Sequence, residues 1–116
     1  MPKKPKTPVV PDDLLGQIEQ LVLIAVLRLG DEAYGMSVFE ALRTAAYPSI
    51  SFGSVYTALE RLTWKGYLKS HLGEPIASRG GRAKKYFRVT ELGKKVLDAT
   101  EETIRRARLI SLPSTS

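Results

Sequence analysis

The segment RGGRAKKY, residues 79–86, has the composition most suggestive of a specific chemistry in this sequence. Arg79, Arg82, Lys84 and Lys85 place four cationic side chains in its first seven residues, around two adjacent glycines. Three kinds of segment fit this composition: a phosphate-binding loop of a nucleotide enzyme, a disordered linker, and a loop that contacts nucleic acid. The segment lacks the Gly-x-x-x-x-Gly-Lys-Ser/Thr pattern, and a strand is expected to follow it, so it is not a P-loop.

The composition narrows the function further. The chain has 116 residues, which suits one domain, and its net charge of +6 favours a polyanionic partner such as nucleic acid or an acidic membrane surface. Cysteine is absent and His71 is the only histidine, which excludes disulfides, thiolate metal sites and cysteine nucleophiles. The longest apolar run, residues 21–27, is too short to cross a bilayer. We therefore expect a cytoplasmic protein that is not an enzyme and has no metal, no cofactor and no membrane partner.

The hydrophobic pattern predicts four helices and two strands. Asp12 or Asp13, Ser51 and Thr90 are suitable N-caps for the first, third and fourth helices. The helices are expected at about residues 12–29, 34–45, 51–66 and 90–110, and the strands at 67–72 and 85–89. The basic segment then forms the far side of a long loop between the two strands.

This order of elements predicts a mainly α fold with a small β-hairpin, a winged helix-turn-helix between an N-terminal helix and a C-terminal helix. The third helix buries one face, and its other face is free to enter a major groove. A charged hairpin loop can then reach the DNA backbone. The expected organisation is a basic flexible arm, a winged helix DNA-binding domain, a C-terminal dimerisation helix and a frayed tail, at residues 1–11, 12–89, 90–110 and 111–116.

Three motifs resemble the PadR family of bacterial transcriptional regulators over about residues 21–99. They are AYGMSVFEAL, SISFGSVYTALERLTWKGYLKS and GRAKKYFRVTELGKKVL. The resemblance implies a homodimer that represses transcription from palindromic operators, and the short C-terminal region resembles the smaller branch with a single C-terminal helix. Trp64 and the long basic hairpin loop depart from the family pattern.

The expected DNA contacts lie on the third helix and the hairpin. Ser54 and Thr57 lie on the exposed face near the start of the recognition helix and are expected to face base edges. Tyr56 could pack at the edge of the core, but the resemblance implies that its hydroxyl holds a phosphate. Tyr34 is expected to be part core and part phosphate contact, and Arg61 could instead pair with an acidic side chain. The full set of predicted DNA-binding residues is Tyr34, Ser51, Ser54, Tyr56, Thr57, Arg61, Arg79, Arg82, Lys84 and Lys85.

The first and last helices carry more apolar side chains than a single small domain is expected to cover. A second copy of the chain would cover this surplus if each last helix packed on the first helix of the other copy. The predicted dimerisation residues are Leu23, Ile24, Leu27, Leu92, Val96, Leu97, Ala99, Thr103 and Ile104. Such an interface leaves room for a small-molecule effector, which the sequence does not name.

Two functions from different classes remain after this reasoning. The first is a sequence-specific DNA-binding transcriptional regulator, acting as a repressor on double-stranded DNA. The alternative is a winged-helix protein-interaction module without specific DNA readout. Salt dependence separates them, because phosphate contacts make the logarithm of the affinity fall with the logarithm of the salt concentration.

Overall fold

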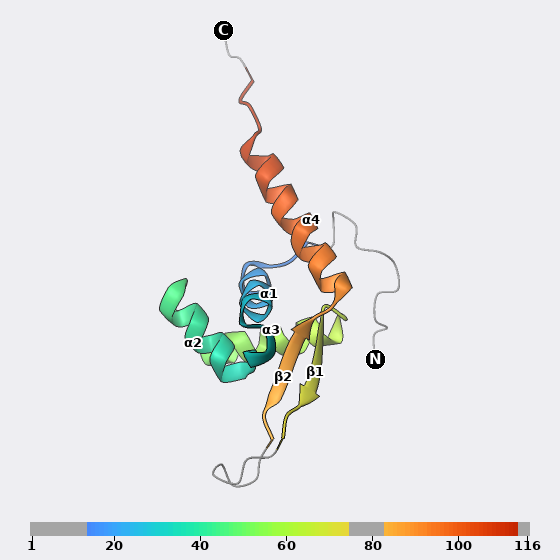
Figure 1. Cartoon of the computed structure of the whole chain (residues 1–116). Helices are drawn as coiled ribbons and strands as arrows, with labels where there is room; N and C mark the ends of the chain where they lie inside the picture. The colour runs from blue at the N-terminus through green and yellow to red at the C-terminus, as the bar shows by residue number, and fades with distance from the viewer. Residues whose placement is uncertain (1–13, 75–82, 114–116) are drawn as a thin grey trace.

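The computed structural model describes residues 14–74 and 83–113. The helices are α1 (Gln17–Leu29), α2 (Gly35–Ala45), α3 (Phe52–Trp64) and α4 (Glu91–Arg108), and the strands are β1 (Leu68–Leu72) and β2 (Lys85–Val89). Helices α1, α2 and α3 form the body of the molecule, and the hairpin and α4 extend from it in opposite directions (Figure 1). This confirms the predicted fold class, a mainly α winged helix with one antiparallel hairpin.

Helix α1 begins at Gln17, later than the sequence pattern predicts. The Glu19 carboxylate accepts a hydrogen bond from the Gly16 backbone N–H at 3.0 Å, which satisfies a donor that the helix leaves open. The backbone N–H of Leu15 instead donates to the Thr100 hydroxyl at 3.1 Å, and this contact ties the start of α1 to α4. The predicted caps Asp12 and Asp13 lie outside the described residues.

The chain itself covers most of α1. Val22, Leu23 and Val26 are almost fully buried, together with Val38 of α2 and Leu59 of α3. The sequence predicts that α1 has more apolar surface than its own domain can cover. In the single chain this holds only for a narrow strip that includes Ile18, Leu21 and Ile24. The reason is that α2, α3, β2 and α4 all pack against this one helix.

The hairpin strands pair in antiparallel register, with Leu68 opposite Val89 and Ser70 opposite Phe87. Phe87 also donates its backbone N–H to the Ala33 carbonyl at 2.9 Å. A short segment before α2 therefore lies along the free edge of β2. This contact links the hairpin to the helical body.

Thr90 and Gly93 fix the start of α4. The Thr90 hydroxyl accepts from the Gly93 backbone N–H at 3.0 Å and donates to the Gly66 carbonyl at 2.7 Å. A side chain at position 93 would collide with the Tyr67 carbonyl, because its Cβ atom would lie 2.2 Å from that oxygen. The predicted cap at Thr90 is confirmed, and Gly93 allows the helix to approach the turn closely.

None of the helices within residues 14–74 and 83–113 is long and apolar enough to span a bilayer. The same part of the chain contains no group of three or more metal-ligating side chains arranged around a common point.

Candidate DNA-binding surface

The exposed face of α3 carries the side chains that the sequence assigns to base contacts. Ser54, Thr57 and Arg61 are exposed, and they line an open hollow of about 450 Å³ between α3 and the start of α1. Val55 and Leu59 on the opposite face are fully buried, so the helix is held firmly behind this surface. Arg61 has no ion-pair partner among the described residues, although pairing with an acidic side chain was one expectation for it.

Ser51 is both exposed and engaged in capping. Its hydroxyl accepts from the Ser54 backbone N–H at 3.0 Å and lies 2.9 Å from the Ser54 hydroxyl. The predicted N-cap is therefore confirmed. The unpaired N–H groups of the first turn give this end of α3 a partial positive charge, which favours a phosphate nearby.

An aromatic edge that the sequence reasoning missed lies beside this face. Phe52 is 41% exposed and Tyr56 is 49% exposed, and their rings are stacked with centroids 6.2 Å apart. Phe52 also packs edge-on against Phe39 of α2, at 5.7 Å. The spacing gave no signal for this exposure, because Phe52 lies three and seven residues before Val55 and Leu59 and so falls on the same apolar stripe of α3.

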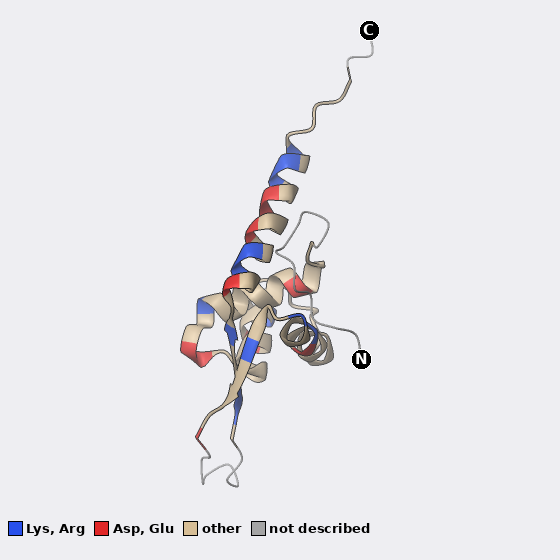
Figure 2. Ribbon diagram, turned by 90° about the vertical axis from the view of Figure 1, so that its right-hand side faces the viewer, with Lys and Arg blue, Asp and Glu red and all other residues tan. Residues whose placement is uncertain are grey.

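Lys84 and Lys85, at the loop end of the hairpin, make different contacts. The Lys85 ammonium lies 3.3 Å from the Glu60 carboxylate, so this lysine joins β2 to α3. The Lys84 ammonium lies 3.8 Å from the centre of the Tyr34 ring, a cation–π contact. Arg79 and Arg82, the other two predicted cations, lie outside the described residues. Both strands of the hairpin carry basic residues, drawn in blue in Figure 2.

The predicted dimerisation residues divide into three groups. Leu23, Val96 and Leu97 are at most 4% exposed and belong to the core of the single chain, so they are not available to a partner as was expected. Their burial has a simple cause, since α1 and the first half of α4 pack on each other and on β2. Partly covered residues are Ile24, Leu92, Ala99 and Thr103, and the exposed ones are Leu27 and Ile104.

One apolar hollow is left open beside these residues. It has a volume of about 620 Å³ and lies between α1, the end of α2 and the end of α4. Its apolar lining comes from Ile18, Leu21, Ile24, Tyr47 and Ile104. These side chains are at most partly buried in the single chain, unlike Leu23 on the other side of α1.

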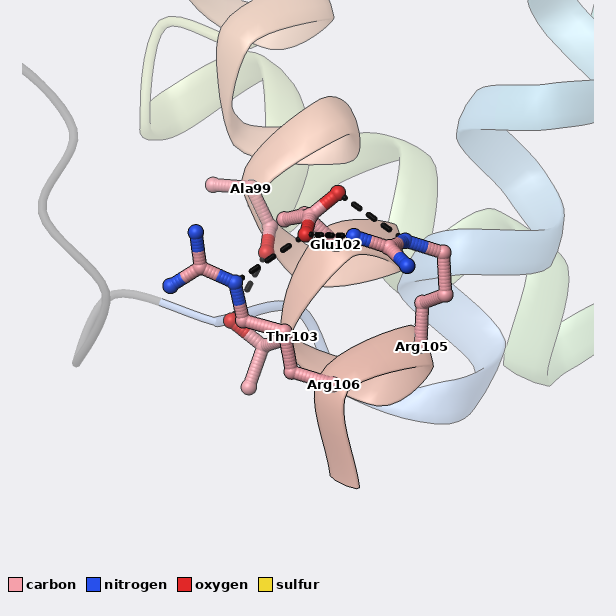
Figure 3. Close-up of polar contacts among 5 residues, drawn as sticks. All are labelled: Ala99, Glu102, Thr103, Arg105 and Arg106. Carbon is pink, nitrogen blue, oxygen red and sulfur yellow. Dashed lines mark hydrogen bonds and ion pairs between the residues drawn. The ribbon is translucent and has the colours of Figure 1, made fainter. Parts of the chain in front are cut away.

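The second half of α4 has local ion pairs where the first half has tertiary packing. Glu102 accepts hydrogen bonds from Arg105 and Arg106, and the Thr103 hydroxyl donates to the Ala99 carbonyl at 2.8 Å (Figure 3). The hydrogen bond from Arg105 lowers the pKa of the Glu102 carboxyl, and the same contact raises the pKa of Arg105. All three charged side chains face solvent, so these contacts add little stability.

Comparison with known proteins supplies the family. Residues 23–99 match the model of the transcriptional regulator PadR-like family. The chain belongs to this family. The match covers α3, the hairpin and the first half of α4, which are the elements described above.

Solved structures agree with this assignment. The PadR-like chain is 27% identical to a PadR family transcription regulator from hypervirulent Clostridium difficile R20291, with a TM-score of 0.67 over 80% of this chain and 92% of that one. It is 27% identical to a protein from Streptococcus mutans UA159, with a TM-score of 0.64 over 90% and 88% of the two chains. A PadR-like transcription factor from Bacteroides fragilis shares the fold at 22% identity, with a TM-score of 0.68 over 80% and 84%. No curated protein matches the sequence.

The PadR-like chain is thus a DNA-binding transcriptional regulator, and its family and fold are not those of an enzyme. We therefore expect the DNA contacts on α3 and the hairpin. The individual residues assigned to those contacts remain predictions.

Proposed function

We propose that this PadR-like regulator is a homodimeric repressor that binds a palindromic operator through α3 and the hairpin loop. The observation that carries the proposal is the division of α3 into a buried face and an exposed face. Ser54 and Thr57 are exposed next to a capped helix start, while Val55 and Leu59 are fully buried behind them. A rigid helix that presents short polar side chains near its N-terminus suits major-groove readout.

In this proposal some side chains contact base edges and others contact phosphates. Ser54 and Thr57 read base edges, with Arg61 further along the same face. Ser51, Tyr56 and Tyr34 hold phosphates, which fix the register of the protein on the duplex without carrying sequence information. The loop cations Arg79, Arg82 and Lys84 add phosphate contacts, whereas Lys85 is engaged by Glu60 and mainly supports the hairpin.

The proposed dimer rests on the apolar hollow beside α1 and on the projecting end of α4. Ile104 is 39% exposed, and Leu109, Ile110 and Leu112 beyond it are at least 67% exposed. If the α4 end of each copy packs on the partly exposed Ile18, Leu21 and Ile24 of the other copy's α1, both surfaces are covered together across a two-fold axis. The same axis repeats the recognition helix, so the two half-sites would lie about 34 Å apart and read as a palindrome.

Repression is the simplest outcome of this architecture, because a dimer seated on promoter DNA blocks access without further contacts. An apolar cavity between the two copies would suit a small-molecule effector. The side chains that line the hollow in one chain do not identify that effector.

The dimer is tested with Ile104→Asp, which places a charge in the proposed interface while the single chain stays folded. The wild type should sediment as a dimer at micromolar concentration and the variant as a monomer with an unchanged circular dichroism spectrum. Specific DNA binding should fall with dimerisation. A wild-type chain that sediments as a monomer would overturn the proposed dimer.

The DNA readout is tested on duplexes of about 30 base pairs selected by the wild type from a random pool, long enough for two half-sites. Thr57→Ala should relax the preference at one or two positions in each half-site, whereas Tyr56→Phe should weaken binding without changing the preference. Replacing Arg79 and Arg82 with alanine should weaken binding to all duplexes and reduce the salt slope by about one unit per lost contact. A chain that selects no duplex would instead favour a protein-interaction module.

A further inference from the structure

One face of the hairpin, at its loop end, carries a row of side chains in contact. The rings of His71 and Tyr86 are nearly parallel, at 19° and 5.7 Å between centroids. The Tyr86 ring then meets the Tyr34 ring edge-on at 5.5 Å. The Lys84 ammonium lies on the Tyr34 ring, at 3.8 Å. The row therefore crosses from β1 through β2 to the segment before α2, with Tyr86 in the middle.

The position of this row in the hairpin gives it a particular role. Leu72 and Lys85 are the last residues of the paired strands, and the Gly73 N–H donates to the Lys84 carbonyl at 2.8 Å just beyond them. The residues between them in the sequence, 75–82, include Arg79 and Arg82 and lie outside the described part of the chain. A two-stranded ribbon has little stability of its own, so contacts outside its ladder must set its direction. The row provides such contacts where the paired strands end on the loop side.

Gly73 shows how closely the Tyr86 ring is fitted. A Cβ atom at position 73 would lie 2.7 Å from one ring carbon of Tyr86 and 3.2 Å from another. The backbone conformation at Gly73 does not itself require glycine, because the only described glycines with positive φ are Gly30 and Gly66. The glycine is therefore required by the ring, and a larger residue would displace Tyr86.

We propose that Tyr86 is a positioning residue for DNA binding, which aims the basic loop at the duplex by clamping β2 between His71 and Tyr34. This inference rests on the proposed DNA contacts of Arg79 and Arg82. Tyr86 itself touches no DNA in this proposal. The Ala33–Phe87 backbone hydrogen bond anchors the edge of β2, and the rings then fix the rotation of the ribbon about that anchor.

The experiment compares Tyr86→Leu with Tyr86→Phe on the selected duplex of about 30 base pairs. The phenylalanine variant keeps the ring contacts and should bind like the wild type. The leucine variant loses two ring contacts and should bind about tenfold more weakly, with a salt slope reduced as in the Arg79→Ala, Arg82→Ala double variant. A role in stability alone would lower the melting temperature and leave the slope unchanged.

A double-mutant cycle makes the test specific. If Tyr86 acts through the loop cations, Tyr86→Leu should have almost no effect on affinity once Arg79 and Arg82 are alanine. Additive losses, or a wild-type salt slope in Tyr86→Leu, would overturn the positioning role while leaving DNA binding by the wild type intact. A wild type that binds no duplex would instead contradict the proposed function.

Gly73→Ala provides a second variant in case Tyr86→Leu does not fold. The added methyl group should displace the Tyr86 ring and reduce the affinity and the salt slope in the same way. In a Tyr86→Leu background that folds, the same methyl group should have no further effect, because the ring is no longer there. If Gly73→Ala folds and keeps wild-type affinity and slope, the positioning role is wrong.

Discussion

The first half of α4, residues 91–100, packs against the rest of the chain, whereas the second half, residues 101–108, projects beyond it (Figure 1). Val96 and Thr100 in the first half are at most 1% exposed, while Ile104 in the second half is 39% exposed. Both halves continue one amphipathic stripe in the sequence. The comparison shows that the stripe alone does not distinguish a side chain buried in its own chain from one left for a partner.

The largest expected effect comes from placing a charge in each half. Val96→Asp puts an unpaired carboxylate into the core and should cost about 4 kcal/mol or more, enough to unfold much of a small domain. Thermal unfolding followed by circular dichroism measures the loss. Ile104→Asp is the matched control: at protein concentrations low enough for the wild type to be monomeric, it should leave the melting temperature nearly unchanged. Equal losses in the two variants would remove the distinction between the halves.

The second prediction concerns Gly93, where the first half of α4 comes close to the Tyr67 carbonyl. Alanine usually stabilises a helix relative to glycine by about 0.5–1 kcal/mol. Gly53→Ala on the exposed face of α3 should do so, because the nearest atom to the added Cβ would be the Ser51 hydroxyl oxygen at 4.0 Å. Gly93→Ala should have the opposite sign and cost about 3 kcal/mol, because its methyl group would overlap the Tyr67 carbonyl. Urea unfolding of the two variants gives both values. A stabilising Gly93→Ala would mean that α4 does not approach the turn so closely.

The third prediction compares two threonines. Thr100→Val removes the acceptor of the buried Leu15 N–H and should cost about 1–3 kcal/mol. Thr103→Val removes a hydroxyl that bonds only to the carbonyl four residues earlier, and should change the stability by less than about 0.5 kcal/mol. Hydrogen exchange at the Leu15 amide should accelerate in the first variant and not in the second. Equal exchange rates would show that the hydroxyl does not hold the start of α1.

The smallest effect is expected from acid. Arg105 lowers the pKa of the Glu102 carboxyl, so its ion pairs stabilise the helix above the pKa of the unfolded chain and are lost as the pH falls through the lower folded value. The carboxyl resonance of Glu102 in an NMR titration should move at a lower pH than that of a free glutamate. Glu102→Gln should leave the melting temperature almost unchanged at neutral pH, because the pair is open to solvent. A normal titration midpoint would mean that the pairs are not populated.

Much of the fold was predictable because local signals agree with tertiary ones. Helices α2 and α3 and both strands begin within a residue or so of the expected positions, and Ser51 and Thr90 cap the helices as predicted. Helix α1 is the exception, since its start depends on Thr100, a residue far away in the sequence. The rings around Tyr86 could not be predicted either, because they come from three separate segments.

The sequence by itself determined the order of elements, the basic loop and the exposed face of α3, since periodicity, capping residues and charge are local properties. It also carried the motifs of the PadR-like family. Only the tertiary structure decided which apolar side chains lie in the chain's own core, that Lys85 pairs with Glu60, and that Gly73 makes room for Tyr86. The physical reason is that burial and contact depend on how elements cross in space, and the crossing points of distant segments leave no local pattern.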